Sequence, residues 1–436
     1  MKTLISCMLT LSGAAGALGQ SCGAWSATAT PSPGASTNLL YDVATTGADA
    51  ALAVGSYSDG VTAPQPLVMR WDGGEWSVLS LPETAGLGTM PSVQGIGRAP
   101  TGAAMWVVGY VRTPYPTDQM PLIIRWENGV WGAPVTPTLR PQTVYPFAAR
   151  GGFAYDVTAL SEDDVWVVGA AVGYGDASAT SVGLALHFDG SSWTDVPVPQ
   201  AGNRHHELSC VSASSSDNVW AVGDWRSIGG AFQALIVRWD GSSWSRVSNP
   251  GEGAGGGDAE AVLALAPDNV WVSGSFYGGS VRLIRWNGSA WETPTTGITG
   301  VVASFAATGT DDIWAADATN ATIHHFDGVS WSASHSGGFP GSAYVLRGWG
   351  MDVYGACGVW AVGGYSDGAV QVTLAERPVP APCRADFNAD GTANSQDFFD
   401  FVSAFFELDG TADFNRDGAV NSQDFFDFLV EFFAGC

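Results

Sequence analysis

Pairs of short apolar runs, joined by a polar stretch, recur along most of the chain. The first run of each pair is rich in Val, Ala and Trp and ends at Gly or Asp, which is typical of a β-strand. Seven copies occur, at Ala51–Gly55 and in runs that begin at Met105, Val165, Val219, Val270, Ile313 and Val359. Each repeat unit contains four short β-rich runs, which is the composition of a propeller blade.

The second run closes on a turn and a tryptophan only six times, at Trp76, Trp131, Trp193, Trp244, Trp291 and Trp331. The seventh repeat lacks both. The missing piece occurs at the other end of the chain, where CGAWSATATP from Cys22 matches the segment after each turn. Because an N-terminal strand can complete the last blade of a ring, we predict an all-β, seven-bladed propeller over residues 20–377, with Trp25 in the seventh outer strand.

Most charged residues of the repeats fit structural positions. Asp-Gly and Asn-Gly between apolar runs are hairpin signals, because both central residues of the tight turn take positive φ. These predict turn residues at Asp72, Asp189, Asp240, Asn287 and Asp327. The pairs before the first runs are also expected in turns: Asp163 with Asp164, Asp217 with Asn218, Asp268 with Asn269, and Asp311 with Asp312.

A cation or imidazole stands just before each aromatic turn. Strand alternation places it on the opposite face from the aromatic residue, where it can pair with a carboxylate of a neighbouring blade or lie over a tryptophan. The set is Arg70, Arg125, His187, Arg238, Arg285 and His325. In overall pattern, residues 22–377 resemble secreted bacterial β-propellers with tryptophan-rich repeats of the type DxVWAVG followed by HFDGxxW, which implies the fold and not a function.

Two acidic segments near the C-terminus are almost identical: DFNADGTANSQDFF from Asp386 and DFNRDGAVNSQDFF from Asp413. Each matches a calcium loop, with oxygen ligands at positions 1, 3, 5, 7, 9 and 12 and glycine at position 6. The predicted ligands are Asp386, Asn388, Asp390, the Thr392 carbonyl, Asn394 and Asp397, then Asp413, Asn415, Asp417, the Ala419 carbonyl, Asn421 and Asp424. We expect two Ca²⁺ ions. The alternative is a loop that only caps a helix, since Asn394 and Asn421 fit N-caps.

The duplicated loop-and-helix layout, with no helix before the first loop and Asp at position 12, makes residues 383–436 resemble a dockerin, an EF-hand-like module. The match is to the short type that starts at Cys and ends in Gly-Cys, as in planctomycete-type secreted proteins. The resemblance implies that loop positions 10 and 11 contribute to partner choice. Here they are Ser395 and Gln396, then Ser422 and Gln423. The implied partner is a cohesin-like protein or another protein of the envelope.

Ten apolar residues of the predicted helices lie on one broad face: Phe398, Phe401, Val402, Phe405, Phe406, Phe425, Phe428, Leu429, Phe432 and Phe433. Most should form the small core, and some should stay exposed as a docking patch.

The N-terminus reads as a secretory signal over residues 1–19, because its apolar run is too short for a membrane-spanning helix. Five cysteines remain afterwards, so one thiol is expected to be unpaired. Cys383 and Cys436 bracket the twin loops, and a disulfide there would contribute roughly 4 kcal/mol. Cys22 with Cys357 is a plausible clasp for the ring. Residues 378–382 are expected to form a proline-rich linker.

The charge is strongly acidic, with 42 Asp and Glu against 17 Lys and Arg. This argues against a nucleic-acid partner and indicates a well-solvated surface and bound divalent cations. The predicted signal segment indicates a secreted or cell-surface protein. Carboxylates that could serve an enzyme are Asp42, Asp156 and Glu207, the last behind His205 and His206, but turn or solvated positions explain them as well. The six histidines show no HExxH spacing.

We therefore predict a non-catalytic propeller that binds a ligand or acts as a scaffold. The alternatives are a dockerin-borne glycosidase or polysaccharide lyase, and a purely structural envelope protein. Trp225, Tyr277 and Tyr365 follow first runs and are expected at one rim, where they would contact a glycan or protein ligand.

Overall fold

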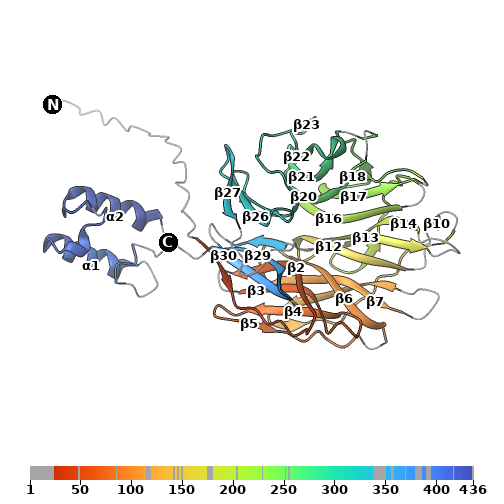
Figure 1. Ribbon diagram of the computed structural model, residues 1–436, viewed down its shortest axis with the longest axis horizontal. Helices are drawn as coiled ribbons and strands as arrows, with labels where there is room; N and C mark the ends of the chain where they lie inside the picture. The colour runs from red at the N-terminus through yellow and green to blue at the C-terminus, as the bar shows by residue number, and fades with distance from the viewer. Residues whose placement is uncertain are drawn as a thin grey trace, which may run out of the picture. The chain divides into compact units, whose positions relative to one another are not determined.

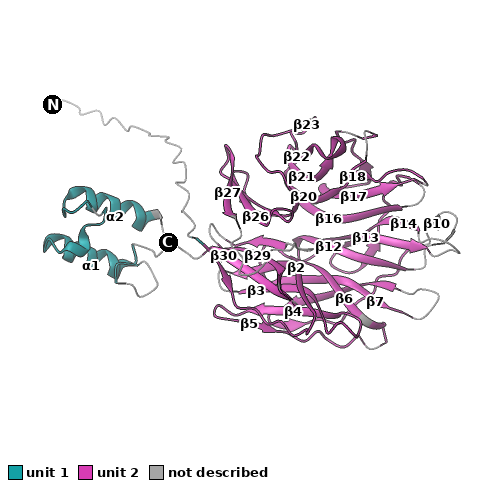
Figure 2. Cartoon of the chain, viewed as in Figure 1, with its two compact units in different colours: residues 1–24, 379–436 teal, residues 25–378 magenta. Residues whose placement is uncertain are grey.

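The computed structural model describes residues 24–434 except 48–49, 85, 114–118, 141–142, 145–146, 149–150, 174–179, 203–204, 228, 251, 254–255, 337–349, 355–357, 369, 379–384, 389–393 and 416. The chain forms two compact units (Figure 2). One is Trp25–Pro378, and the other includes Val379–Cys436. The predicted signal segment, linker residues 379–382 and all predicted disulfide partners lie outside the described residues. Cys210, the one described cysteine, is a free thiol.

The larger unit contains seven four-stranded antiparallel sheets (Figure 1). Blades 1 to 3 are β2 (Thr37–Gly47), β3 (Ala50–Ser58), β4 (Gln65–Trp71) and β5 (Trp76–Val78); β6 (Thr89–Arg98), β7 (Ala104–Arg112), β8 (Gln119–Glu127) and β9 (Val130–Trp131); and β12 (Gly151–Ser161), β13 (Asp164–Gly173), β14 (Thr180–Phe188) and β15 (Trp193–Asp195). A small hairpin, β10 (Thr143–Val144) with β11 (Phe147–Ala148), precedes blade 3.

Blades 4 to 6 repeat the arrangement. They are β16 (His205–Ser215), β17 (Asn218–Arg226), β18 (Gln233–Trp239) and β19 (Trp244–Arg246); β20 (Ala259–Ala266), β21 (Asn269–Phe276), β22 (Val281–Trp286) and β23 (Trp291–Glu292); and β24 (Val302–Gly309), β25 (Asp312–Asp317), β26 (Thr322–Phe326) and β27 (Trp331–Ser336). A single 3₁₀ turn, η1 (Tyr277–Gly279), joins β21 to β22.

The two chain ends together build blade 7. It consists of β28 (Gly350–Val353), β29 (Val359–Asp367) and β30 (Val370–Pro378), and β1 (Trp25–Thr28) pairs with β30 as the outer strand. The first strands contact one another from β2 to β28, and β28 contacts β2 again, so the ring is closed. The seven-bladed propeller and the place of Trp25 are confirmed. Strand β30 extends through Pro378, the first residue of the segment that we expected to be a linker.

The hydrophobic cores lie between blades, and the repeated tryptophans explain why. The second strand of a blade carries a buried tryptophan whose ring packs on the aromatic pair at the outer turn of the next blade. Trp166 contacts Trp239 and Trp244, and Trp220 contacts Trp286 and Trp291. Three further contacts continue the series: Trp271 with Phe326 and Trp331, Trp314 with Trp25, and Trp360 with Trp71 and Trp76. The tryptophan period of the sequence is therefore the period of the inter-blade contacts.

The C-terminal unit has two helices, α1 (Ser395–Phe406) and α2 (Ser422–Ala434), and a 3₁₀ turn, η2 (Gly410–Ala412). Its core centres on Phe401 and Phe428, which are fully buried and stacked with their ring centroids 3.9 Å apart. Most of the predicted apolar face packs around this pair. Phe406 and Phe433 do not, since each side chain is 79% exposed. No helix of the described residues has the length and apolar character needed to cross a membrane.

Candidate functional site

The aspartates of the outer turns are structural, as predicted. The Asp189 carboxylate accepts hydrogen bonds from the backbone N–H groups of Ser191 and Ser192, and the Ser191 hydroxyl also donates to it. The two backbone N–H bonds recur at Asp72, Asp240, Asn287 and Asp327. The predicted conformation was wrong in one respect: the loops have four residues, and only the glycine takes positive φ. The Asp or Asn side chain accepts the backbone N–H groups of the turn, so a second residue with positive φ is not needed.

The cations before the turns also have the predicted structural role in five of six blades. Arg125, Arg238 and Arg285 lie over the tryptophan opposite them, at 5.3, 5.6 and 5.4 Å from the ring centroids. His187 and His325 stack on Trp166 and Trp314, and each also hydrogen-bonds an aspartate, Asp164 or Asp312. In blade 1 the opposite residue is Leu52, and Arg70 is exposed.

Asp42 and Asp156 hold neighbouring blades together, so their reading as turn or solvated residues was wrong. Both follow a β-bulge in an innermost strand, β2 or β12. Asp42 accepts the N–H of Ile96 in blade 2, and Asp156 accepts the N–H of Val211 in blade 4, at 2.9 and 2.8 Å. Burial raises the pKa of Asp156 to about 6, although the backbone hydrogen bonds from Val211 and Val157 oppose the shift. Burial and then the charge of Asp156 raise the pKa of Asp42 well above its usual value.

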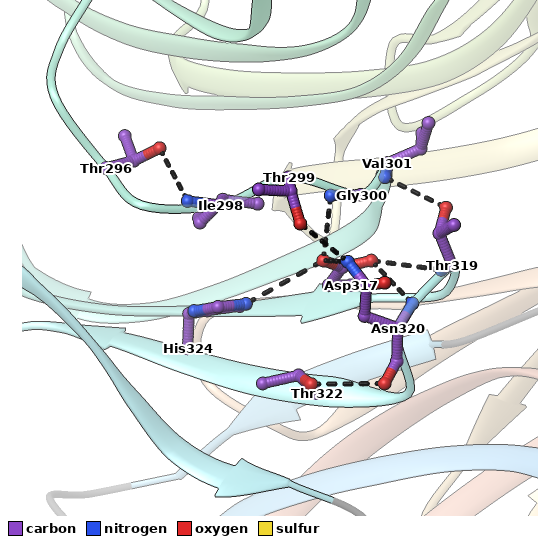
Figure 3. Close-up of polar contacts among 10 residues, drawn as sticks. All are labelled: Thr296, Ile298, Thr299, Gly300, Val301, Asp317, Thr319, Asn320, Thr322 and His324. Carbon is purple, nitrogen blue, oxygen red and sulfur yellow. Dashed lines mark hydrogen bonds and ion pairs between the residues drawn. The ribbon is translucent and has the colours of Figure 1, made fainter.

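Asp317, at the end of β25, bonds instead within its own blade, where it holds the loops of blade 6 (Figure 3). Its buried carboxylate accepts the backbone N–H of Gly300, Thr319 and Asn320 and the side-chain amide of Asn320. Burial opposes ionisation, but these bonds and His324 outweigh it and lower the pKa of Asp317. Every oxygen of this carboxylate already has donors, which assigns Asp317 to the structure of the loop.

A cleft of about 470 Å³ opens on the rim between blades 4 and 5. Its wall consists of Asp224 and Phe232 from blade 4, and Gly256, Gly257, Asp258, Ser275 and Gly278 from blade 5. Gly257 is required there, because a Cβ atom would fall 2.0 Å from the carbonyl oxygen of Ser275. The cleft thus combines a carboxylate wall with backbone at close approach, the arrangement of a small polar binding site.

Three side chains converge at the blade 4 side of this cleft: His205, Glu207 and Asp224. His205 and Glu207 point to one face of β16, and Asp224 lies directly opposite Glu207 on β17. The Nε2 atom of His205 lies 2.8 Å from Asp224 Oδ1 and 3.2 Å from Glu207 Oε1. Burial lowers the pKa of His205, but the two carboxylates outweigh it and raise the pKa to about 9. Sequence reasoning named His205 and Glu207 but missed Asp224, because only strand register reveals this pairing.

More carboxylates surround this group. Desolvation by the surrounding protein, and then the charge of Asp258, raises the pKa of Glu260 to about 7, although part of the residue is exposed to solvent. His206, the neighbour of His205, points into the protein instead and accepts the Gly183 N–H through Nδ1. Burial lowers the pKa of His206 to about 4.

Aromatic residues border the cleft, though not all of those predicted. Tyr277 is 49% exposed beside the cleft residue Gly278, and Phe232, which sequence reasoning missed, is 40% exposed. The Arg226 guanidinium lies over the Phe232 ring, 4.2 Å from its centroid. Trp225 is half-buried under Arg246 at 4.8 Å, and Tyr365 is half-buried on β29. Tyr277 and Phe232 are therefore the aromatic surfaces that a ligand in this cleft would meet.

The second C-terminal loop is described except for Arg416. The Asp413 and Asn415 side-chain oxygens both accept the backbone N–H of Asp417, at 3.1 and 2.9 Å. Asp424, fully buried, accepts the N–H groups of Asn415 and Asn421. The side-chain oxygens of Asp413 and Asn415 therefore lie close together, and Asp424 holds the two sides of the loop through its backbone bonds. These oxygen ligands fit a hard cation.

The first loop has the same closure where it is described. Asp397 is fully buried and accepts the N–H groups of Asn388 and Asn394, while Asn394 caps α1 in a capping box. The capping role considered from the sequence is thus confirmed for Asn394. Asp390 and Thr392 lie outside the described residues. Ser395, Gln396, Ser422 and Gln423 begin the helices and are exposed in both copies.

The chain matches no protein family and no curated protein. Among solved structures, similar folds include YCF48 bound to a D1 peptide, 14% identical over 82% of this chain and 99% of that one, with a TM-score of 0.47. YCF48 from Cyanidioschyzon merolae is 18% identical over 81% and 98%, with a TM-score of 0.46. Trypanosoma rangeli sialidase in complex with 2,3-difluorosialic acid is 9% identical over 78% of this chain and 53% of that one, with a TM-score of 0.45.

Proposed function

We propose that this protein is an exported propeller that binds a ligand at the rim between blades 4 and 5 and is attached to an extracellular or envelope partner by a calcium-dependent, dockerin-like module. The observation that carries the binding role is the cleft itself, which combines a carboxylate wall with the exposed rings of Phe232 and Tyr277. A cleft of this character fits the hydroxyl groups and apolar faces of a glycan, or a basic peptide.

The attachment role rests on the two C-terminal loops. In each loop a buried aspartate, Asp397 or Asp424, accepts backbone N–H groups of the loop and so holds it closed. Both helices begin with the same exposed Ser-Gln pair. The ligand set of each loop supplies three carboxylates to a divalent ion, which suits Ca²⁺ outside the cell. Because binding couples to folding, the ion would stabilise the module by about 2.7 kcal/mol at 100-fold excess over the dissociation constant.

The calcium role is tested on the full chain by thermal unfolding with Ca²⁺ or with a chelator. The expected result is a calcium-dependent transition that Asp413→Ala weakens and that Asp427→Ala leaves in place, since Asp427 is a helix carboxylate bonded to Gln423 outside the ligand set. Equal transitions with and without calcium would refute the role.

The ligand role is tested by retention of the full chain on immobilised polysaccharides and basic peptides. Asp258→Ala and Phe232→Ala should each reduce retention, while Glu75→Ala in a distant outer turn should not. A chain that no panel member retains, or whose retention the cleft variants leave unchanged, would contradict the proposal.

A second candidate is a carbohydrate-active enzyme acting at the same cleft. The observation in its favour is the raised pKa of Glu260 beside Asp258, since a carboxyl group that stays protonated near neutral pH can act as a general acid. Release of reducing ends or unsaturated products from a polysaccharide, abolished by Glu260→Gln, would identify an enzyme.

A further inference from the structure

We infer that His205, Glu207 and Asp224 bind a divalent transition-metal ion at the edge of the rim cleft, at a site separate from the calcium loops. The ligand atoms would be His205 Nε2, one oxygen of Glu207 and one oxygen of Asp224. All three lie within 4.8 Å of one another. One imidazole nitrogen and two carboxylate oxygens with an open side are ligands typical of zinc and related ions.

The distances fit ligands of one ion. Zinc lies about 2.0–2.2 Å from nitrogen and oxygen ligands, so neighbouring ligand atoms in its shell are roughly 3 Å apart. The Nε2 atom of His205 is 2.8 and 3.2 Å from the two carboxylate oxygens. An ion bound by His205 Nε2 and either carboxylate oxygen would therefore have these ligands at ordinary spacing.

The contact between His205 and Asp224 differs in geometry from a hydrogen bond. His205 Nε2 and Asp224 Oδ1 are both buried and make no hydrogen bond of acceptable geometry, despite their separation of 2.8 Å. Two other histidines of the propeller show the contrast. His187 and His325 approach Asp164 and Asp312 at similar distances, and both form proper hydrogen bonds. An ion bound between these two buried atoms would satisfy both of them.

Electrostatics point the same way. Glu207 and Asp224 face each other directly across β16 and β17, and like charges in that position repel. Asp258 adds another carboxylate to the cleft wall. A protonated His205 neutralises one charge, whereas a divalent ion with neutral His205 neutralises both. The ion would therefore remove the repulsion between Glu207 and Asp224 that a protonated His205 removes only in part.

The orientation of the imidazole is already set. His205 Nδ1 lies 3.2 Å from the Ser181 hydroxyl oxygen, which also accepts the His206 N–H. If Nδ1–H donates to this oxygen, the lone pair of Nε2 faces the two carboxylates. Metal-binding histidines commonly have such a partner on their second nitrogen, which holds the ring and the tautomer. The open side of the ion would face the 470 Å³ cleft, where a ligand oxygen could complete its shell.

This inference deepens the proposed ligand-binding function, but it is tested without any ligand, so the two can fail separately. The full chain, saturated with Ca²⁺ to occupy the C-terminal loops, is titrated with Zn²⁺ by calorimetry and with Co²⁺ by absorption. The expected result is one equivalent of Zn²⁺, and visible Co²⁺ bands from nitrogen and carboxylate ligands. His205→Ala should abolish both, and Ser181→Ala should weaken Zn²⁺ binding about 10-fold.

Conservative and control variants guard against misfolding. Glu207→Gln and Asp224→Asn keep side-chain volume and should each weaken Zn²⁺ binding more than 10-fold. His325→Ala removes a histidine of similar exposure that pairs with one carboxylate, Asp312, and it should retain the Zn²⁺ equivalent. The inference is overturned if wild-type protein binds no Zn²⁺ under these conditions, if Glu207→Gln and Asp224→Asn bind it unchanged, or if His325→Ala loses the same equivalent.

Discussion

Asp352 joins three blades at the inner edge of the ring, and its removal should destabilise the propeller strongly. Asp352 lies on β28 of blade 7, and its Oδ2 atom accepts three hydrogen bonds from the next two blades. Thr45 of blade 1 donates its backbone N–H at 2.8 Å and its hydroxyl at 2.9 Å, and Arg98 of blade 2 donates Nε–H at 2.9 Å. Asp352 therefore links the last blade to the first two.

The magnitude follows from what Asp352→Ala leaves behind. Thr45 is fully buried, so its N–H and hydroxyl would lose their acceptor at a cost of about 1–3 kcal/mol. The Arg98 and Asp352 side chains are each 23% exposed, so screening limits the ion pair to about 1 kcal/mol. We expect a loss of about 3 kcal/mol in the free energy of unfolding. Asp352→Asn keeps one acceptor oxygen for Thr45 and should cost about 1 kcal/mol.

The assay is urea unfolding of the full chain in calcium, with a double-mutant cycle. Arg98→Ala combined with Asp352→Ala should show a coupling energy of about 0.5–1 kcal/mol. Glu75→Ala, an exposed carboxylate in an outer turn, is the control and should stay within about 0.5 kcal/mol of wild type. If Asp352→Ala lies within that same range, the reasoning about ring closure is wrong.

Three further predictions concern single residues. Burial raises the folded-state pKa of Asp156 to about 6, so its contribution to stability is present below about pH 4 and is lost as the pH rises through 6. Asp156→Asn should therefore gain stability relative to wild type between pH 4 and 7. A difference in Tm that stays constant over this range would contradict this. Trp25→Ala removes an edge contact with Trp314 at 5.7 Å and a hydrogen bond to Ser334, so urea unfolding should show a loss of about 2 kcal/mol, against none for the exposed Ser26→Ala. Asp317→Ala leaves the buried Gly300 N–H without an acceptor and should cost about 2–4 kcal/mol, whereas a cost below that of Asp317→Asn would show that the loop does not depend on these bonds.

The repeat pattern alone predicted the architecture, because its signals are local or strictly periodic. The missing seventh turn and the extra Trp25 predicted the pairing of β1 with β30, since a strand without a partner must find an edge that lacks one. The aspartates of the outer turns and the cations opposite the tryptophans were also predictable. Their partners lie within the same hairpin, and strand alternation sets the geometry.

The polar contacts between innermost strands of neighbouring blades could not be predicted from the sequence. Asp42 and Asp156 looked like turn or solvated residues, yet each binds a backbone N–H about 55 residues further along the chain. Their partners depend on how far one blade is rotated from the next, and on bulges that redirect the side chains. Asp352 gave no signal at all, since Thr45 precedes it by 307 residues.

The sequence by itself therefore determined the number of blades, the strand that closes the ring, and two loops with the spacing of calcium ligands. Each depends on residues that are close together in the chain or repeat at a regular interval. Only the tertiary structure decided that His205, Glu207 and Asp224 converge beside a cleft, and that Asp42 and Asp156 do not. The reason is that β-register brings Glu207 opposite Asp224, while packing between blades turns the other two carboxylates toward backbone donors.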